Sequence, residues 1–123
     1  MKTMGRNSFQ AAELADMVAQ ARATDRYAGE VLRSDLLSVG LYLLSAGGTD
    51  DQSPHNEDEV YYAVSGRATL RVGEEDHPVQ PGTLLFVPAL EVHFFHDIED
   101  ELVLVVFCAP PEKSVQPKRR PRV

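Results

Sequence analysis

Apolar residues recur at helical intervals only near the N-terminus of the chain. Spacings of three and four residues place side chains on one stripe of an α-helix. The positions of this stripe are Phe9, Leu14, Met17, Val18 and Ala21. Asn7 or Ser8 can cap the first turn, and Gln10 stands at the capping-box position. The pattern predicts a short amphipathic helix from this cap through Ala23, packed on the fold or on a neighbouring subunit.

From Tyr27 onward the pattern changes to short apolar or alternating runs, separated by Gly, Pro and acidic residues. Such runs predict β-strands. The expected strands are residues 30–34, 36–45, 60–64, 68–72, 84–87, 92–96 and 102–107. We expect residues 65–67, around Gly66, to form a turn, and residues 73–76 and 97–101 to form acidic turns. Many short strands behind one helix predict an all-β sandwich or closed barrel.

The chain of 123 residues fits one domain, and its 43% hydrophobic and 25% charged content is ordinary for a globular protein. The expected divisions are an N-terminal helical segment (1–26), the barrel (27–109) and a flexible basic tail (110–123). The net charge of −7 combines an acidic body with this tail, which holds five Lys or Arg and one Glu. An acidic body repels phosphates, so we expect no nucleic-acid partner.

Targeting and redox signals are few. No apolar run reaches the length of a membrane span, and the N-terminus lacks the apolar core of a signal peptide. The single cysteine, Cys108, cannot form an internal disulfide, and we interpret it as a small buried hydrophobe. These features predict a cytoplasmic protein with no membrane partner.

Two stretches of the chain carry side chains that suit a metal ion. Residues 47–66 offer His55 and Glu59, and residues 82–97 offer His93. Two His with one carboxylate and open positions suit non-haem Fe(II) in particular. Pairing the two stretches as strands would place His93 across from Glu59, within reach of one ion. The sequence therefore predicts a metal site formed by His55, Glu59 and His93.

Other polar residues near these stretches receive different interpretations. His96 has the opposite strand parity to His93, so we expect it to face away from the site. Glu57 and Asp58 are assigned to solvent, and His77 to an exposed turn.

Aromatic residues are expected around the site. Tyr61 and Phe95 share the parity of the ligands on their strands, and Phe86 is placed beside them. Plain core packing explains these residues equally well. The Tyr61 hydroxyl could serve as an acid or as a hydrogen-bond donor, which makes Tyr61 the predicted catalytic residue. Asp97 would orient a ligand or simply begin a turn.

The first stretch resembles the first of the two sequence motifs of the cupins, a family of small jelly-roll barrels. Glu59 and Gly66 stand at the last two motif positions with the family's gap, and His55 falls on the second of its two His. Ser53 replaces the first His, so two His and one Glu remain where many cupins have three His and one Glu. Two outcomes stay open: a three-ligand metal site with open positions, and a weakened site that survives as a metal-free pocket.

The second stretch resembles the second cupin motif. Gly82, Pro88 and His93 stand at matching positions. Leu90 replaces the usual Gly, and Asp97 replaces the usual Asn.

The resemblance covers about residues 36–109 and implies a jelly-roll β-barrel with a short N-terminal helix. It also implies a divalent transition metal (Fe, Mn, Ni or Zn), a small-molecule ligand or substrate, and a homodimer, for which exposed Tyr62 and Val64 would suit the contact. Three functions stay open: a metal-dependent enzyme, either dioxygenase-like or an isomerase or lyase; a module that binds a small molecule without turning it over; and a metal-free module.

Overall fold

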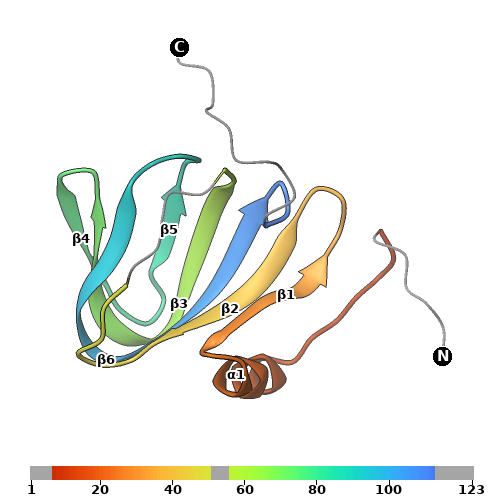
Figure 1. The fold of residues 1–123 in the computed structure, drawn as a ribbon, viewed down its shortest axis with the longest axis horizontal. Coiled ribbons are helices and arrows are strands. Elements are labelled where there is room, and N and C mark those ends of the chain that lie inside the picture. Colours follow the sequence, from red (N-terminus) through yellow and green to blue (C-terminus); the bar gives the residue numbers. More distant parts are fainter. Residues whose placement is uncertain (1–6, 51–55, 113–123) are drawn as a thin grey trace, which may run out of the picture.

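The computed structural model describes residues 7–50 and 56–112, which form an antiparallel β-sheet with a short helix (Figure 1). The elements are α1 (Leu14–Ala23), β1 (Tyr27–Arg33), β2 (Ser38–Leu44), β3 (Asp58–Val72), β4 (Glu75–Val79), β5 (Leu84–Val87) and β6 (His93–Ala109). The strands lie in the order β1-β2-β6-β3-β4, and β5 pairs with β3. The predicted all-β jelly-roll fold with a short N-terminal helix is confirmed.

The two longest strands, β3 and β6, carry the curvature of the sheet (Figure 1). Glu59 near the beginning of β3 lies opposite Cys108 near the end of β6, and Val72 at the end of β3 lies opposite His93. The register of this pair shifts repeatedly between residues 63 and 69. Such bulges bend a strand and increase its twist. The sheet therefore curls, and the beginnings of β3 and β6 come to face each other.

Apolar side chains pack on both faces of this curled sheet. The inner cluster includes Leu70, Leu85, Val87, Leu102, Leu104 and Val106. The outer cluster consists of Met17, Ala21, Ala28, Val39, Leu41, Leu43 and Val103. Helix α1 contacts β1 and β2 and covers this part of the outer face (Figure 1). Arg22 and Arg26 both bind the Glu101 carboxylate, which ties the end of the helix to β6.

The helix begins later than the sequence predicts. It starts at Leu14, and its N-cap residue Glu13 makes no side-chain capping hydrogen bond. The side chain of Gln10 instead bridges the backbone of Arg33, accepting from its N–H at 2.9 Å and donating to its carbonyl at 2.6 Å. Tertiary contacts with the end of β1 therefore override the local capping signal. In the described residues no helix is long and apolar enough to span a membrane.

Two of the predicted turns are continuous strand. Residues 65–67 lie inside β3, and residues 97–101 lie inside β6. Gly66 has a φ of 100°, and a Cβ built on it would lie 2.2 Å from the carbonyl oxygen of Glu101. Glycine is thus required by a close approach of two strands at a bulge, and no turn is involved. Asp97, with a φ of 49°, bends β6 without ending it.

Candidate metal centre

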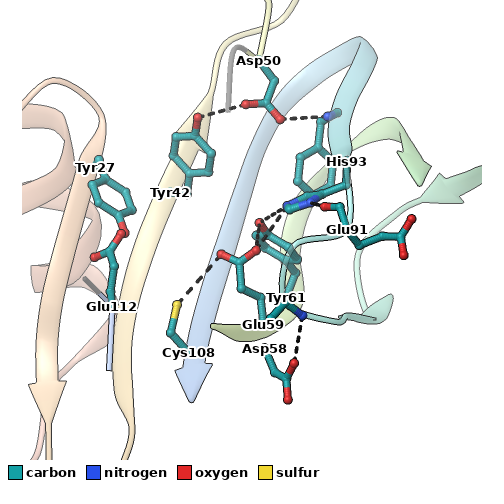
Figure 2. A network of polar contacts seen from close by, with 12 residues as sticks. Tyr27, Tyr42, Asp50, Asp58, Glu59, Tyr61, Glu91, His93, Cys108 and Glu112 are labelled. Atoms are coloured by element: carbon teal, nitrogen blue, oxygen red, sulfur yellow. Dashed lines mark hydrogen bonds and ion pairs between the residues drawn. The ribbon is translucent and has the colours of Figure 1, made fainter. Parts of the chain in front are cut away.

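Three polar side chains meet inside the curled sheet: Glu59 and Tyr61 from β3, and His93 from the beginning of β6 (Figure 2). Nε2 of His93 lies 3.2 Å from Oε1 of Glu59, and the Tyr61 hydroxyl lies 3.1 Å from each of these atoms. All three residues are buried. The sequence predicted that Glu59 and His93 meet, but through the wrong strand pairing. His93 pairs with Val72, and the curl of the sheet brings it to Glu59.

The backbone near His93 determines which ring nitrogen faces Glu59. Nδ1 lies 2.9 Å from the carbonyl oxygen of Glu91. A carbonyl can only accept, so Nδ1 carries the proton, and Nε2 of the neutral ring presents its lone pair to Glu59 and Tyr61. This carbonyl belongs to a turn in which the Glu91 N–H donates to Pro88 and Leu90 has a φ of 68°. That left-handed backbone explains why the related motif usually has Gly at the position of Leu90.

The electrostatics of the centre favour a bound positive charge. The lone pair of His93 and the carboxylate oxygen of Glu59 repel each other at 3.2 Å unless a proton or a metal ion lies between them. Burial lowers the pKa of His93, but the hydrogen bond to Glu59 and the other polar contacts outweigh it, and the net shift is upward. Burial, and then the charge of Glu59, raise the pKa of Tyr61, so its hydroxyl stays a neutral donor.

The donor set fits a divalent transition metal. Neighbouring ligand atoms that bind one such ion at about 2.1 Å lie roughly 3 Å apart, close to the separation of Nε2 and Oε1. Among residues 7–50 and 56–112, no group of three or more His, Cys, Asp or Glu side chains is placed to hold a metal ion. The predicted third ligand, His55, lies outside the described residues, and so does Ser53.

Cys108 lies beside the centre. Its Sγ is 3.9 Å from Oε2 of Glu59, on the opposite side of the carboxylate from His93 (Figure 2). Burial, reinforced by the charge of Glu59, raises the pKa of the thiol. Cys108 is therefore a protonated thiol that donates weakly to Glu59, and it is buried as the sequence predicted.

Asp50 belongs to the same group of contacts, and sequence reasoning missed it. It is buried, and its Oδ2 accepts a hydrogen bond from the Phe95 backbone N–H at 2.8 Å. Its Oδ1 accepts one from the Tyr42 hydroxyl at 3.2 Å (Figure 2). The Phe95 ring in turn packs edge-to-face on Tyr61, with ring centroids 5.3 Å apart. The sequence shows Asp50 only as one member of an acidic run, which gave no signal for burial.

A second buried carboxylate, Glu112, contacts residues of β1 and β2 (Figure 2). It accepts a hydrogen bond from the Tyr27 hydroxyl, and its backbone N–H donates to Oγ of Ser38 at 2.9 Å. Like Asp50, it is therefore a buried carboxylate that holds a tyrosine hydroxyl. Unlike Asp50, it makes no direct contact with the segment that carries His93 in the interactions described.

Several residues lie away from their predicted places. Phe86, predicted beside the site, is 63% exposed on the outer face, because β5 turns Leu85 and Val87 inward instead. Glu57, predicted to face solvent, is buried. The side chain of Asp58, also assigned to solvent, accepts a hydrogen bond from the backbone N–H of Ala89 at 2.9 Å.

The remaining histidines and the acidic position after His93 lie apart from the centre. His96 faces away from it as predicted, with its ring nitrogens 3.0 Å from Asp76 and 3.1 Å from Asp97. Asp97 therefore contacts His96, and none of its described contacts reaches the centre. His77 lies on β4, because that strand begins at Glu75 where a longer turn was predicted.

A curled antiparallel sheet with a buried His–Glu pair between its two longest strands defines a small jelly-roll protein with a polar centre. Residues 40–110, more than half of the chain, match the model of the cupin domain. The chain therefore belongs to the cupin family.

Relatives in two bacterial species resemble most of the chain. An uncharacterised protein of Streptomyces coelicolor is 45% identical over 104 residues, which cover 85% of this chain and 99% of that protein. The crystal structure of TT1209 from Thermus thermophilus is 33% identical with a TM-score of 0.58, and the match covers 71% of this chain and 86% of that chain.

An enzyme shares the fold at lower identity. The DMSP lyase DddQ from Ruegeria pomeroyi is 22% identical with a TM-score of 0.64, and the match covers 77% of this chain and 52% of that chain. At this identity the likeness shows the fold alone.

Proposed function

We propose that Glu59 and His93, together with His55, hold a divalent transition metal (Fe, Mn, Ni or Zn), and that this cupin acts on a small molecule there. The observation that carries the proposal is the buried approach of His93 Nε2 to Glu59 Oε1 at 3.2 Å. A buried carboxylate is costly unless positive charge compensates it. The position of His55 in the first motif supports it as the third ligand.

The site supports chemistry in which the metal and Tyr61 have separate roles. A bound divalent metal would supply a Lewis acid that polarises an oxygen atom of a small substrate. Tyr61 keeps its proton because its pKa is raised by burial, so its neutral hydroxyl donates a hydrogen bond to a ligand beside Glu59 and His93. The contact of His93 Nδ1 with Glu91 keeps Nε2 directed at the centre. This arrangement serves a dioxygenase-like reaction and an isomerase or lyase reaction alike.

The alternative is a cupin that binds a small molecule without turning it over, with or without a metal. One observation favours it: the Tyr61 hydroxyl bridges Glu59 and His93 directly, at 3.1 Å from each. With His93 protonated, these three side chains form a hydrogen-bonded group that holds together without an ion.

Metal content decides between a centre that holds a metal ion and a metal-free module. Protein purified without chelator and without a His-rich tag is expected to contain near-stoichiometric iron, manganese, nickel or zinc, because His and carboxylate donors match these ions. Elemental mass spectrometry of the purified protein measures this content. Protein that stays empty after incubation with an excess of each metal would contradict the metal proposal and favour the metal-free module.

We also propose that two copies of the chain associate through the outer face of β5 and β3. Leu84 and Phe86 of β5 are 66% and 63% exposed, and Tyr62 of β3 lies opposite Leu84. Helix α1 packs instead over β1 and β2. Exposed apolar strips on a sheet mark contact surfaces.

Phe86→Asp is expected to convert this dimer into a monomer at micromolar concentration, because it places a charge within the apolar contact. Size-exclusion chromatography with light scattering measures the mass. Leu36→Asp is the matched control: Leu36 is exposed to a similar extent, but it lies between β1 and β2, so this variant should remain dimeric. A monomeric wild-type protein would reject the proposed contact.

A further inference from the structure

Two carboxylates join the two segments that carry the proposed metal ligands. Asp50 accepts from the Phe95 N–H at 2.8 Å, and Asp58 accepts from the Ala89 N–H at 2.9 Å (Figure 2). Ala89 precedes His93 and Phe95 follows it, so the two contacts lie on either side of this ligand. Both acceptors belong to the first motif segment, and both donors are backbone groups of the second. The segment carrying His93 is thus held at two points.

The contact made by Asp50 is the more buried of the two. Asp50 is 9% exposed and Phe95 is 1% exposed. A buried hydrogen bond from a backbone N–H to a carboxylate is short and strong, because the charge strengthens it and water does not compete. The Tyr42 hydroxyl binds the other carboxylate oxygen and fixes the orientation of the Asp50 side chain.

Each carboxylate is connected to the Glu59–Tyr61–His93 centre through one neighbouring residue or turn. Phe95, held by Asp50, packs on the Tyr61 ring, and the Tyr61 hydroxyl contacts both proposed ligands. Asp58 directly precedes Glu59, and its partner Ala89 lies in the turn that presents the Glu91 carbonyl to His93. Both contacts therefore bear on the position and orientation of the His93 ring.

We propose that Asp50 and Asp58 are positioning residues, which hold His93 Nε2 and the Glu59 carboxylate at the separation that one metal ion requires. This inference rests on the proposed function, because metal binding is the property that the positioning serves. Groups that orient metal ligands without touching the metal usually change its affinity when they are removed. A carboxylate that only stabilised the fold would change unfolding and leave the affinity of the folded protein unchanged.

The test compares Zn²⁺ affinity with stability in three variants. Asp50→Ala is expected to weaken Zn²⁺ binding by about 10–100-fold. Asp50→Asn should restore most of this affinity, because its amide oxygen can still accept from Phe95. Glu112→Ala is the comparison variant: it removes a buried carboxylate that also holds a tyrosine hydroxyl but contacts neither the Phe95 nor the Ala89 N–H, so it should lower stability with a much smaller change in Zn²⁺ affinity than Asp50→Ala. Competition with a chromophoric chelator measures affinity, and urea unfolding measures stability.

A second readout needs no metal. Two-bond ¹H–¹⁵N spectra of the metal-free protein, recorded at a pH high enough to leave the His93 ring neutral, report its tautomer, which should be the Nδ1–H form in the wild type. Asp50→Ala should give a mixture of tautomers, and Glu112→Ala should not. If Asp50→Ala does not fold, Asp58→Ala provides both readouts, because Asp58 is only partly buried.

The outcomes separate this inference from the proposed function. Unchanged Zn²⁺ affinity and an unchanged tautomer in both Asp50→Ala and Asp58→Ala overturn the positioning role. If the wild-type protein binds no Zn²⁺, the His93 spectra alone decide: a tautomer mixture in Asp50→Ala supports positioning while the metal proposal fails, and a single tautomer overturns the inference.

Discussion

His93→Ala is expected to abolish near-stoichiometric metal binding, with a loss of affinity greater than about 100-fold. Removal of an outer partner of a metal ligand costs about 10–100-fold, and His93 is a proposed ligand itself. Without the imidazole that lies 3.2 Å from Glu59, only Glu59 and His55 of the three proposed ligands remain, which is too few to hold the ion tightly. The curled sheet should stay folded, since its apolar core is formed by other residues. Elemental analysis and circular dichroism measure the two results.

The matched control for this prediction is His96→Ala. His96 lies on the same strand, but its ring binds Asp76 and Asp97 at the surface. Its removal should leave metal content at the wild-type level. If His93→Ala keeps its metal, the assignment of the second motif is wrong. If both variants lose metal, the loss comes from disruption of β6 and not from removal of a metal ligand.

Gly66→Ala is expected to destabilise the protein by about 3 kcal/mol. The left-handed backbone costs a residue with a Cβ roughly 1–2 kcal/mol, and overpacking adds about 1–3 kcal/mol. The structural cause is local: the new Cβ would lie 2.2 Å from the Glu101 carbonyl oxygen and 2.6 Å from Leu102 Cα. These neighbours are backbone atoms of β6, which cannot move aside without breaking the pairing of β3 with β6. Urea unfolding of the variant measures the loss.

Gly82→Ala separates the two contributions to this effect. Gly82 has a φ of 96°, close to the 100° of Gly66, but nothing lies within 4 Å of the position of its Cβ. This variant should lose only the backbone contribution, about 1–2 kcal/mol. Equal losses in the two variants would show that the contact between β3 and β6 does not require glycine.

The sequence predicted the structure best where a residue type requires a particular backbone conformation, or where strand alternation determines which face a side chain is on. Glycine and proline positions located the two motifs, and strand parity correctly placed Tyr61 and Phe95 in the interior and His96 on the outer face. The prediction for Phe86 was wrong because parity orders residues within one strand, and it does not say which parity of β5 faces the interior.

Two further errors concern the length of strands and the partners of polar groups. Gly66 and the acidic residues 97–101 were interpreted as turns, but a bulge and a bend allow β3 and β6 to continue through them. Their length is what curls the sheet, so the true pairing of His93 could not be derived from local patterns. Asp50 was missed because its partner is a backbone N–H, which every residue but proline carries and which has no sequence signature.

The placement of Cys108 gives the protein a chemical reporter of its own. It is the single cysteine of the chain, it is buried, and its Sγ lies beside Glu59. Only a thiolate reacts with alkylating reagents, and a buried thiol with a raised pKa reacts only when the surrounding structure opens. The rate of alkylation therefore measures how often the interior next to Glu59 is exposed, in the natural sequence and without an attached label.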